Sequence, residues 1–309
     1  MSEREDGGAG EARSADRGGP AQAGGPQAVT PLVEAAGIVR RYGDVLASDA
    51  VDLTIPAGTT VGLVGESGSG KSTLGRVIAG LEEADGGTLR FDGEEVTRPS
   101  RGRLRALSRE RQLVFQDPVA SLNPRRTVAQ AIEEPLSIHG VAAAARRARV
   151  AELLELVGLG RRFADRYPRS LSGGQCQRVG IARALALEPR LVILDEAVSA
   201  LDVSVQAQVL NLLHDLQQRL GLTYLFISHD LGVVRYMAEQ IVVLRHGRVV
   251  ERGAREALFV APAEAYTREL IAAVPTIVHD PAAAAAGSAP GAAGGPVEPP
   301  IPGARPDAA

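Results

Sequence analysis

The amino-acid sequence predicts an α/β protein with a mainly parallel sheet, an antiparallel β part and an inserted helical part. Apolar runs of strand length alternate with helical stretches, as in sheets whose parallel strands are joined by crossing helices. One such run, at 60–64, leads through a glycine-rich turn directly into a helix start. Between 127 and 159 the apolar residues take helical spacing, so a helical insert interrupts the alternation.

The first elements in chain order are strands. Ranges 32–41 and 50–55 have strand character, and the second stops at a Pro-Ala-Gly turn signal. The strand at 60–64 follows, with its helix from about 74. Range 86–93 predicts a short edge strand that ends in an Asp-Gly turn.

A short strand at 111–116 precedes the helical insert, and sheet character returns afterwards. A helix is expected after Gly173, and one at 206–220 has leucines and valines along a single face. The remaining predicted strands are 190–196, 223–228 and a hairpin of 240–245 with 248–252. Residues 265–275 favour a packing helix that a proline ends.

The domain organisation follows from composition. Residues 1–30 contain almost no large apolar side chains and are predicted to be disordered. The same applies to 279–309, where Pro281 opens a run of Ala, Gly and Pro. Residues 31–278 then form the folded domain, with its helical subdomain at about 117–180. The chain shows no internal repeat, so it is expected to contain one copy of this domain.

Bulk properties exclude several classes of protein. The formal net charge of -3 gives no support for a nucleic-acid-binding surface. One cysteine, Cys176, excludes an internal disulfide, a thiolate zinc cluster and a protein-held iron–sulfur centre. No stretch approaches 18 uninterrupted apolar residues, so a membrane role is expected to depend on partner proteins.

The glycine-rich stretch from Gly65 to Thr73 has the pattern of a phosphate-binding loop. Its glycines allow the backbone to turn closely around a polyphosphate, and the N–H groups of the following helix start favour an anion. Lys71 supplies a cation for the β- and γ-phosphates, and the Ser72 hydroxyl is a ligand for Mg²⁺. The residues expected to contact the nucleotide here are Gly65, Ser67, Gly68, Gly70, Lys71, Ser72 and Thr73.

Lys71 is the only lysine in a chain with 34 basic residues. The planar guanidinium of arginine does not replace a compact ammonium surrounded by a backbone loop. The alternative, a glycine-serine turn that arises by chance, does not explain why strand, loop, lysine and helix occur together. The sequence therefore predicts a nucleoside triphosphate site.

A second motif places two carboxylates after an apolar strand, at Asp195 and Glu196. Ligands bind at the carboxyl edge of open α/β sheets. Asp195 is expected to hold Mg²⁺, and Glu196 to polarise a water for attack on the γ-phosphate. The alternative, an acid pair that caps a helix, is less favoured because a phosphate loop lies upstream.

A third motif, Leu171 to Gln175, combines a serine with paired glycines at a helix start, which is a second potential anion site. One triphosphate does not need two such sites, so this one is interpreted as facing the nucleotide of another subunit. An N-cap and turn is the alternative, and the motif's position between the helical insert and the acidic strand argues against it. The residues concerned are Ser172, Gly173, Gly174 and Gln175.

Together these motifs resemble an ATP-binding cassette (ABC) transporter ATPase from about Leu32 to Pro275. The resemblance implies a phosphate-loop nucleotidase core with an antiparallel β subdomain and a helical subdomain. It implies further roles: Gln116 in a loop that reaches Mg²⁺ and the attacking water and couples to membrane subunits, His229 at the γ-phosphate, and Tyr42 stacked on adenine. The stacked ring fits ATP but does not distinguish it from GTP.

The resemblance also implies a head-to-tail dimer in which two ATP molecules lie between one subunit's phosphate loop and the other's signature motif. Stretches 115–125, 198–213 and 265–275 are similar to the oligopeptide and dipeptide importer branch. The implied partners are two transmembrane permease subunits at the cytoplasmic face of the membrane, a second cassette chain, and indirectly an extracytoplasmic solute-binding protein.

Several alternatives stay open at this point. A soluble cassette ATPase of translation or DNA repair usually needs two cassettes or a long coiled coil, and neither is seen in the sequence. An exporter ATPase is disfavoured by the importer-like stretches. A nucleotide kinase or GTPase would leave the signature motif unused. The cargo (a peptide, nickel or another solute) and the choice between homodimer and heterodimer are not determined.

Overall fold

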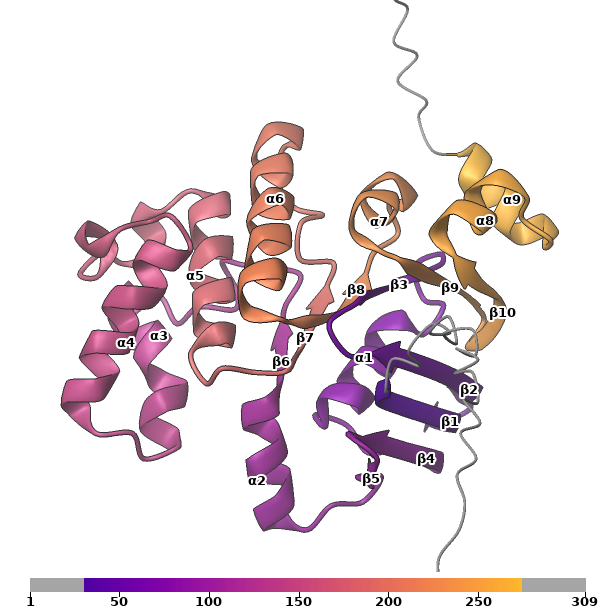
Figure 1. Cartoon of the computed structure of the whole chain (residues 1–309), viewed down its shortest axis with the longest axis horizontal. Helices are drawn as coiled ribbons and strands as arrows, with labels where there is room; N and C mark the ends of the chain where they lie inside the picture. The colour runs from indigo at the N-terminus through magenta and orange to yellow at the C-terminus, as the bar shows by residue number, and fades with distance from the viewer. Residues whose placement is uncertain (1–30, 274–309) are drawn as a thin grey trace, which may run out of the picture.

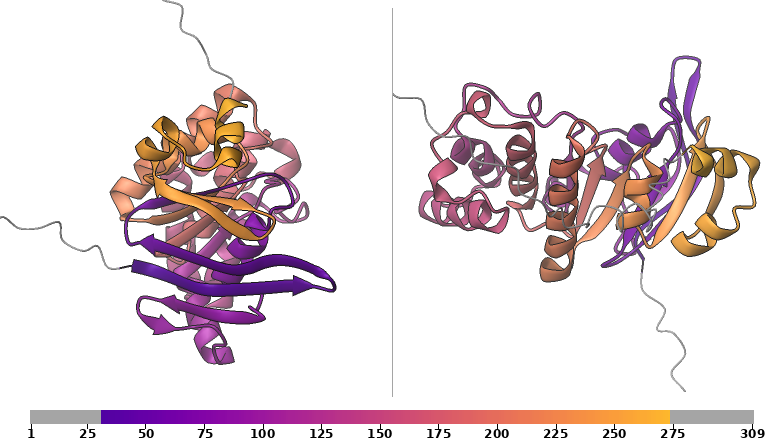
Figure 2. Two further views of the ribbon diagram at one scale, coloured as in Figure 1. Left: turned by 90° about the vertical axis from the view of Figure 1, so that its right-hand side faces the viewer. Right: turned by 90° about the horizontal axis from the view of Figure 1, so that it is seen from above.

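A computed structural model describes residues 31–273, and the two predicted tails lie outside these residues. The described chain contains a six-stranded sheet, a four-stranded sheet and helices packed on both (Figure 1). The helical part around α3, α4 and α5 lies at one end of the molecule, and α8 and α9 lie at the other (Figures 1 and 2). The glycine-rich loop before α1 and the acidic end of β7 belong to the sheet region between these two ends.

The six-stranded sheet has the order β10-β9-β3-β8-β7-β6. Its strands are β3 (Thr60–Val64), β6 (Arg111–Val114), β7 (Leu191–Asp195), β8 (Thr223–Ile227), β9 (Gln240–Arg245) and β10 (Arg248–Ala254). All neighbours pair in parallel except β9 and β10, which form the antiparallel edge that the sequence predicts. Every residue of β3, β7 and β8 is buried, as expected of parallel strands that are covered on both faces.

The two faces of this sheet belong to different cores. On one face, residues such as Ile193 and Leu225 pack with α1 (Lys71–Ala79) and the antiparallel sheet. On the other face, Val192 and Phe226 pack with the helices of the other core. Alternation along each strand therefore places α1 and its phosphate loop on one side and the long helices on the other.

The antiparallel sheet has the order β2-β1-β4-β5. Its strands are β1 (Pro31–Tyr42), β2 (Val45–Pro56), β4 (Gly86–Phe91) and β5 (Glu94–Glu95). The strand predicted at 86–93 and its Asp-Gly turn are confirmed. Its predicted place at the sheet edge is wrong, because the chain returns after the turn for two more paired residues. This short β5 forms the edge, and β4 lies between it and β1.

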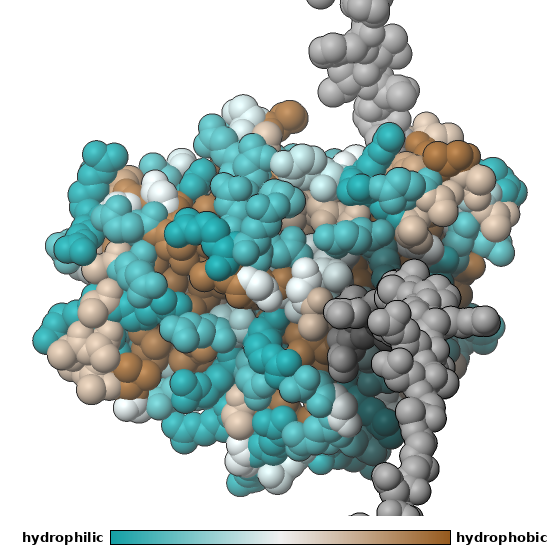
Figure 3. All heavy atoms as spheres, in the orientation of Figure 1, coloured by the Kyte–Doolittle hydropathy of each residue, from teal (hydrophilic) through white to brown (hydrophobic). Residues whose placement is uncertain are grey.

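The helical period predicted over 127–159 is confirmed by α3 (Val128–Ile138) and α4 (Ala143–Leu156). They pack with α5 (Gly173–Leu185) around buried residues that include Ile132, Leu153 and Val179. Thr127 and Gln130 form a capping box that sets the start of α3. Figure 3 shows apolar side chains gathered over α3 and α5 on a face that is otherwise mostly hydrophilic.

Three α-helices were not predicted, and one of them is the six-residue α8 (Arg255–Val260). In α2 (Arg101–Glu110) only Leu107 is buried, so the charged segment has little apolar period. The third, α7 (Leu231–Met237), is too short for a period to be recognised. In addition, α6 (Val203–Leu220) begins three residues before the predicted start, because the Asp202 carboxylate caps its first turn and accepts the Val205 N–H at 2.9 Å.

The C-terminal elements are α8 (Arg255–Val260) and α9 (Ala265–Ala272). The predicted packing helix is confirmed by α9, and the proline expected to end it, Pro275, lies outside the described residues. Within residues 31–273, none of the helices combines the length and the apolar character that a membrane crossing requires.

Candidate functional site

The phosphate loop connects β3 to α1 and leaves the start of that helix open. Gly70 precedes α1 with φ +101°, and no side chain caps the helix. A Cβ on Gly70 would lie 2.0 Å from the Ala47 carbonyl oxygen, and one on Gly65 would lie 2.1 Å from the Leu244 carbonyl oxygen. Glycine is therefore required by the neighbouring backbone, and the uncapped N–H groups of α1 form a cradle that fits an anion.

Lys71 is held inside this loop by two carbonyl groups. Its Nζ donates to the oxygens of Gly65 and Glu66, both at 2.8 Å, and the residue is 4% exposed. Burial lowers the pKa of Lys71, and nearby carboxylates oppose that shift. The loop thus presents an ammonium group in a fixed place beside the helix start, which fits the negative charge of a polyphosphate.

Ser72 and Asp195 form the second part of the site. The Ser72 hydroxyl donates to Asp195 Oδ1 at 2.7 Å, which links the first turn of α1 to the end of β7. Burial raises the pKa of Asp195, against the opposing effects of Ser72 and Arg76. Oxygen donors of this kind suit Mg²⁺. Residues 31–273 contain no cluster of three or more His, Cys, Asp or Glu suited to a metal.

Glu196 lies where three neighbouring strands end. Gln116, after β6, donates from Nε2 to one Glu196 carboxylate oxygen at 2.9 Å. His229, after β8, places Nδ1 3.4 Å from the other oxygen. The Glu196 backbone has φ +47°, a conformation that costs energy in a residue with a side chain and occurs frequently at functional sites. The structure therefore brings together Glu196 and Gln116, which were predicted to act on the attacking water, and His229, which was predicted to lie at the γ-phosphate.

The signature motif begins α5. Ser172 accepts the Gln175 N–H at 3.3 Å, and the Gln175 side chain accepts the Ser172 N–H at 3.0 Å, which forms a capping box. The expectation that this motif is not an N-cap is wrong, because the helix start needs such partners whether or not a nucleotide is present. The motif lies apart from α1 in Figure 1, on the helical side of the sheet.

The two glycines of this motif differ in their surroundings. A Cβ on Gly174 would lie 2.3 Å from Val205 Cγ1, whereas one on Gly173 would find Leu201 Cδ2 at 3.5 Å, an ordinary contact. We expect Gly174→Ala to push α5 away from α6 and to lower the free energy of unfolding by about 1–3 kcal/mol. Urea unfolding measures this, with Gly173→Ala as the matched control. Equal unfolding midpoints for both variants would contradict the packing argument.

Tyr42 ends β1 and is 42% exposed. Its hydroxyl is hydrogen-bonded to the Glu82 carboxylate, and the Arg40 guanidinium lies 4.7 Å from the centre of its ring. One face of the ring is therefore already covered by a cation, and adenine stacking would use the other face.

One residue at the phosphate loop was missed by sequence reasoning. Tyr266 of α9 is 4% exposed, and its hydroxyl accepts the Glu66 N–H at 3.1 Å across 200 positions of sequence. The sequence shows only an apolar helical period in this segment. Nothing in the sequence around Tyr266 indicates that its side chain contacts the phosphate loop.

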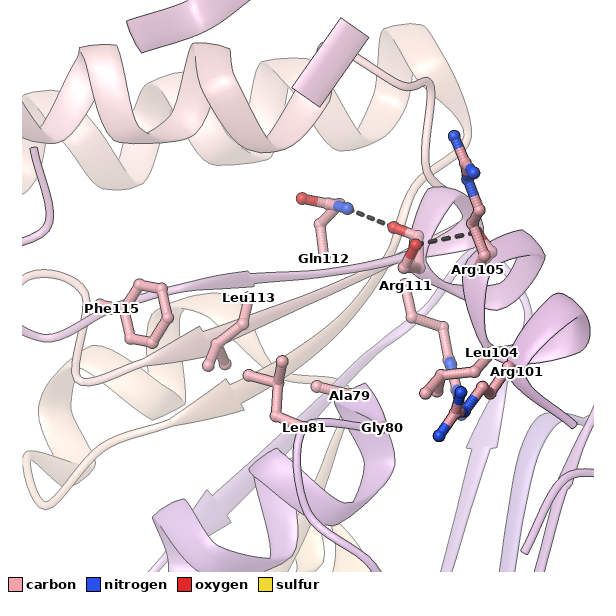
Figure 4. Close-up of a pocket in the computed structure, with 11 residues that line it drawn as sticks. Ala79, Gly80, Leu81, Arg101, Leu104, Arg105, Arg111, Gln112, Leu113 and Phe115 are labelled. Carbon is pink, nitrogen blue, oxygen red and sulfur yellow. Dashed lines mark hydrogen bonds between the residues drawn. The ribbon is translucent and has the colours of Figure 1, made fainter. Parts of the chain in front are cut away.

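An apolar groove lies beside the residues that precede Gln116. The end of α1, helix α2 and strand β6 with the following Phe115 enclose it (Figure 4). Leu81, Leu104 and Phe115 expose 59%, 38% and 43% of their surface, and Arg101 and Arg105 also line the groove. Exposed apolar side chains grouped in this way mark a surface that can bind another protein.

Comparison with known proteins relates this site to transport. Residues 48–199 match the family model described as ABC transporter. The chain is 52% identical over 236 residues to the oligopeptide transport ATP-binding protein OppF of Bacillus subtilis, across 75% of this chain and 77% of that protein. It is 52% identical over 233 residues to the glutathione import ATP-binding protein GsiA of Escherichia coli O157:H7, across 75% of this chain and 37% of that protein.

A solved structure agrees with these matches. It is the dimeric, post-hydrolysis form of the ATP-binding cassette MJ0796 bound to ADP and Pi. The TM-score is 0.65 at 32% identity, and the match covers 72% of this chain and 98% of that one.

Proposed function

This chain belongs to the ABC transporter family, and from that premise we propose that it is the ATP-hydrolysing subunit of an importer for oligopeptides, dipeptides or a related solute. The observation that carries the proposal is the meeting of strand ends at one edge of the parallel sheet. This edge carries the open start of α1 and the Ser72–Asp195 pair. It also carries the Glu196 carboxylate, which contacts Gln116 and His229. The solute class comes from the relatives, which are named for oligopeptide transport and glutathione import.

In the proposed reaction, the loop N–H groups and Lys71 bind the phosphates of ATP and hold them in line with an attacking water. Glu196 accepts the proton of that water. Gln116 and His229, which contact the two carboxylate oxygens, fix the direction of this base. Ser72, Asp195 and Gln116 would hold Mg²⁺, which supplies charge neutralisation for the phosphates when bound.

We assign the signature motif to a second cassette. Ser172, Gly173, Gly174 and Gln175 would contact the ATP held by the phosphate loop of a partner chain, and the partner would do the same in return. The MJ0796 cassette is a dimer bound to ADP and Pi, which supports a dimeric assembly for this chain. The partner is a second copy of this chain or a related cassette chain.

The apolar groove is proposed as the docking surface for the membrane-spanning permease subunits. It adjoins Phe115, which directly precedes the Gln116 that contacts Glu196, so a segment bound there lies one residue from the hydrolysis site. In this proposal the chain lies at the cytoplasmic face of the membrane, below two permeases that receive solute from an extracytoplasmic binding protein.

The test is co-purification of the tagged chain from solubilised membranes. We expect Leu81→Asp to reduce recovery of membrane-spanning partners at least tenfold, because a charge in an apolar contact is costly to bury. ATP affinity should stay the same. Leu220→Asp, at the end of α6 and 46% exposed, is the matched control outside the groove. Partner recovery that is unchanged in Leu81→Asp would contradict docking in this groove.

A further inference from the structure

The contact between α9 and the phosphate loop acts on one particular peptide group. The Glu66 N–H that donates to Tyr266 belongs to the same peptide plane as the Gly65 carbonyl, which accepts a hydrogen bond from Lys71 Nζ at 2.8 Å. A peptide unit is rigid and planar, so fixing its N–H fixes the direction of its C=O. Tyr266 thereby orients a carbonyl that holds the lysine of the nucleotide site.

The Tyr266 phenol is itself held in place. The Arg245 guanidinium lies 4.6 Å from the centre of its ring, at the end of β9. The start of α9 is anchored by the Glu251 carboxylate of β10, which accepts the N–H groups of Ala263 at 2.8 Å and Glu264 at 3.2 Å. The neighbouring Thr267 is fully buried. The hydroxyl therefore reaches the loop from a supported helix.

We propose that Tyr266 is a positioning residue for nucleotide binding: it orders the phosphate loop in advance through the Gly65–Glu66 peptide group. The inference rests on the proposed function, since it requires that the loop bind ATP. A loop that is already ordered loses less conformational freedom when ligand binds, so the tyrosine contributes to affinity without touching the nucleotide. Coupling is reciprocal, so bound nucleotide in turn stabilises α9.

The first test is Tyr266→Phe in the full-length chain, which removes the hydroxyl and keeps the ring. We expect the Kd for a fluorescent ATP analogue to rise about three- to tenfold, the range for loss of one hydrogen bond. The KM for ATP should rise with it, whereas kcat changes less, because Glu196 and its partners are untouched. Tyr236→Phe is the matched control, since that hydroxyl binds Asn211 between α7 and α6.

The second test needs no variant. Hydrogen exchange of residues 265–272 is measured on the unmodified chain with and without ATP, and slower exchange with ATP supports the proposal. Loss of that protection in Tyr266→Phe, with an unchanged thermal midpoint, supports it further. The proposal is overturned if ATP leaves α9 exchange unchanged, or if Tyr266→Phe binds the analogue as tightly as Tyr236→Phe does. If the unmodified chain itself binds no ATP, the proposed function fails as well, and this is seen before any variant is compared.

Discussion

Glu196→Gln is expected to slow ATP hydrolysis strongly while ATP binding is retained. The amide has nearly the same shape as the carboxylate but cannot accept the proton of the attacking water. General-base catalysis of this kind contributes about 10²- to 10⁴-fold, so kcat should fall by that factor. Release of phosphate from the purified chain measures kcat, and a fluorescent ATP analogue measures binding.

The control for this variant is Glu188→Gln. Glu188 also has a positive φ of +55°, and it lies on the surface, 3.5 Å from Arg149. Its substitution should leave turnover unchanged. Turnover of Glu196→Gln at the level of the unmodified chain would show that another group takes the proton.

The same variant also tests the assembly. A chain that binds ATP and cannot hydrolyse it should remain in the ATP-bound dimer. An affinity pull-down from solubilised membranes, with ATP present, should then recover two membrane-spanning proteins together with a second cassette chain or a second copy. Recovery of ribosomes or DNA-repair factors without membrane proteins would show that the transport assignment is wrong and leave the ATPase chemistry in place.

Lys71→Met is expected to weaken ATP binding about 100-fold, which corresponds to the loss of charge-assisted hydrogen bonds to the phosphates. Lys71→Arg should restore little of this affinity. The ammonium occupies a site with two carbonyl oxygens at 2.8 Å and 4% exposure, and the larger planar guanidinium does not fit there. Isothermal titration calorimetry with ATP compares the three proteins.

The comparison of Met with Arg at position 71 separates charge from shape. If a positive charge were the only requirement, Lys71→Arg would bind ATP as the unmodified chain does, and the shape argument would be refuted. Thermal unfolding of both variants shows whether the fold is retained, because the loop lies on the packed helix α1.

The strands and the phosphate loop could be predicted because their signals are local. Apolar runs of four or five residues mark β3, β7 and β8, and the glycine and lysine pattern marks the loop between β3 and α1. Helices α2 and α7 were missed for the same reason: one is too charged and the other too short to produce a period. The capping box of Ser172 and Gln175 is also a local pattern, although the sequence analysis argued against an N-cap there.

Contacts between distant segments could not be obtained in that way. Each of Gln116, Glu196 and His229 stands in a recognisable motif, but their distances depend on the order of β6, β7 and β8 in the sheet. The contact of Tyr266 with Glu66 depends on where α9 packs, and nothing near either residue encodes it. Sequence motifs thus identify the chemistry of the site, because they consist of residues that are adjacent along the backbone. Tertiary packing decides which distant side chains orient the catalytic groups, because it brings together residues that are far apart in the sequence.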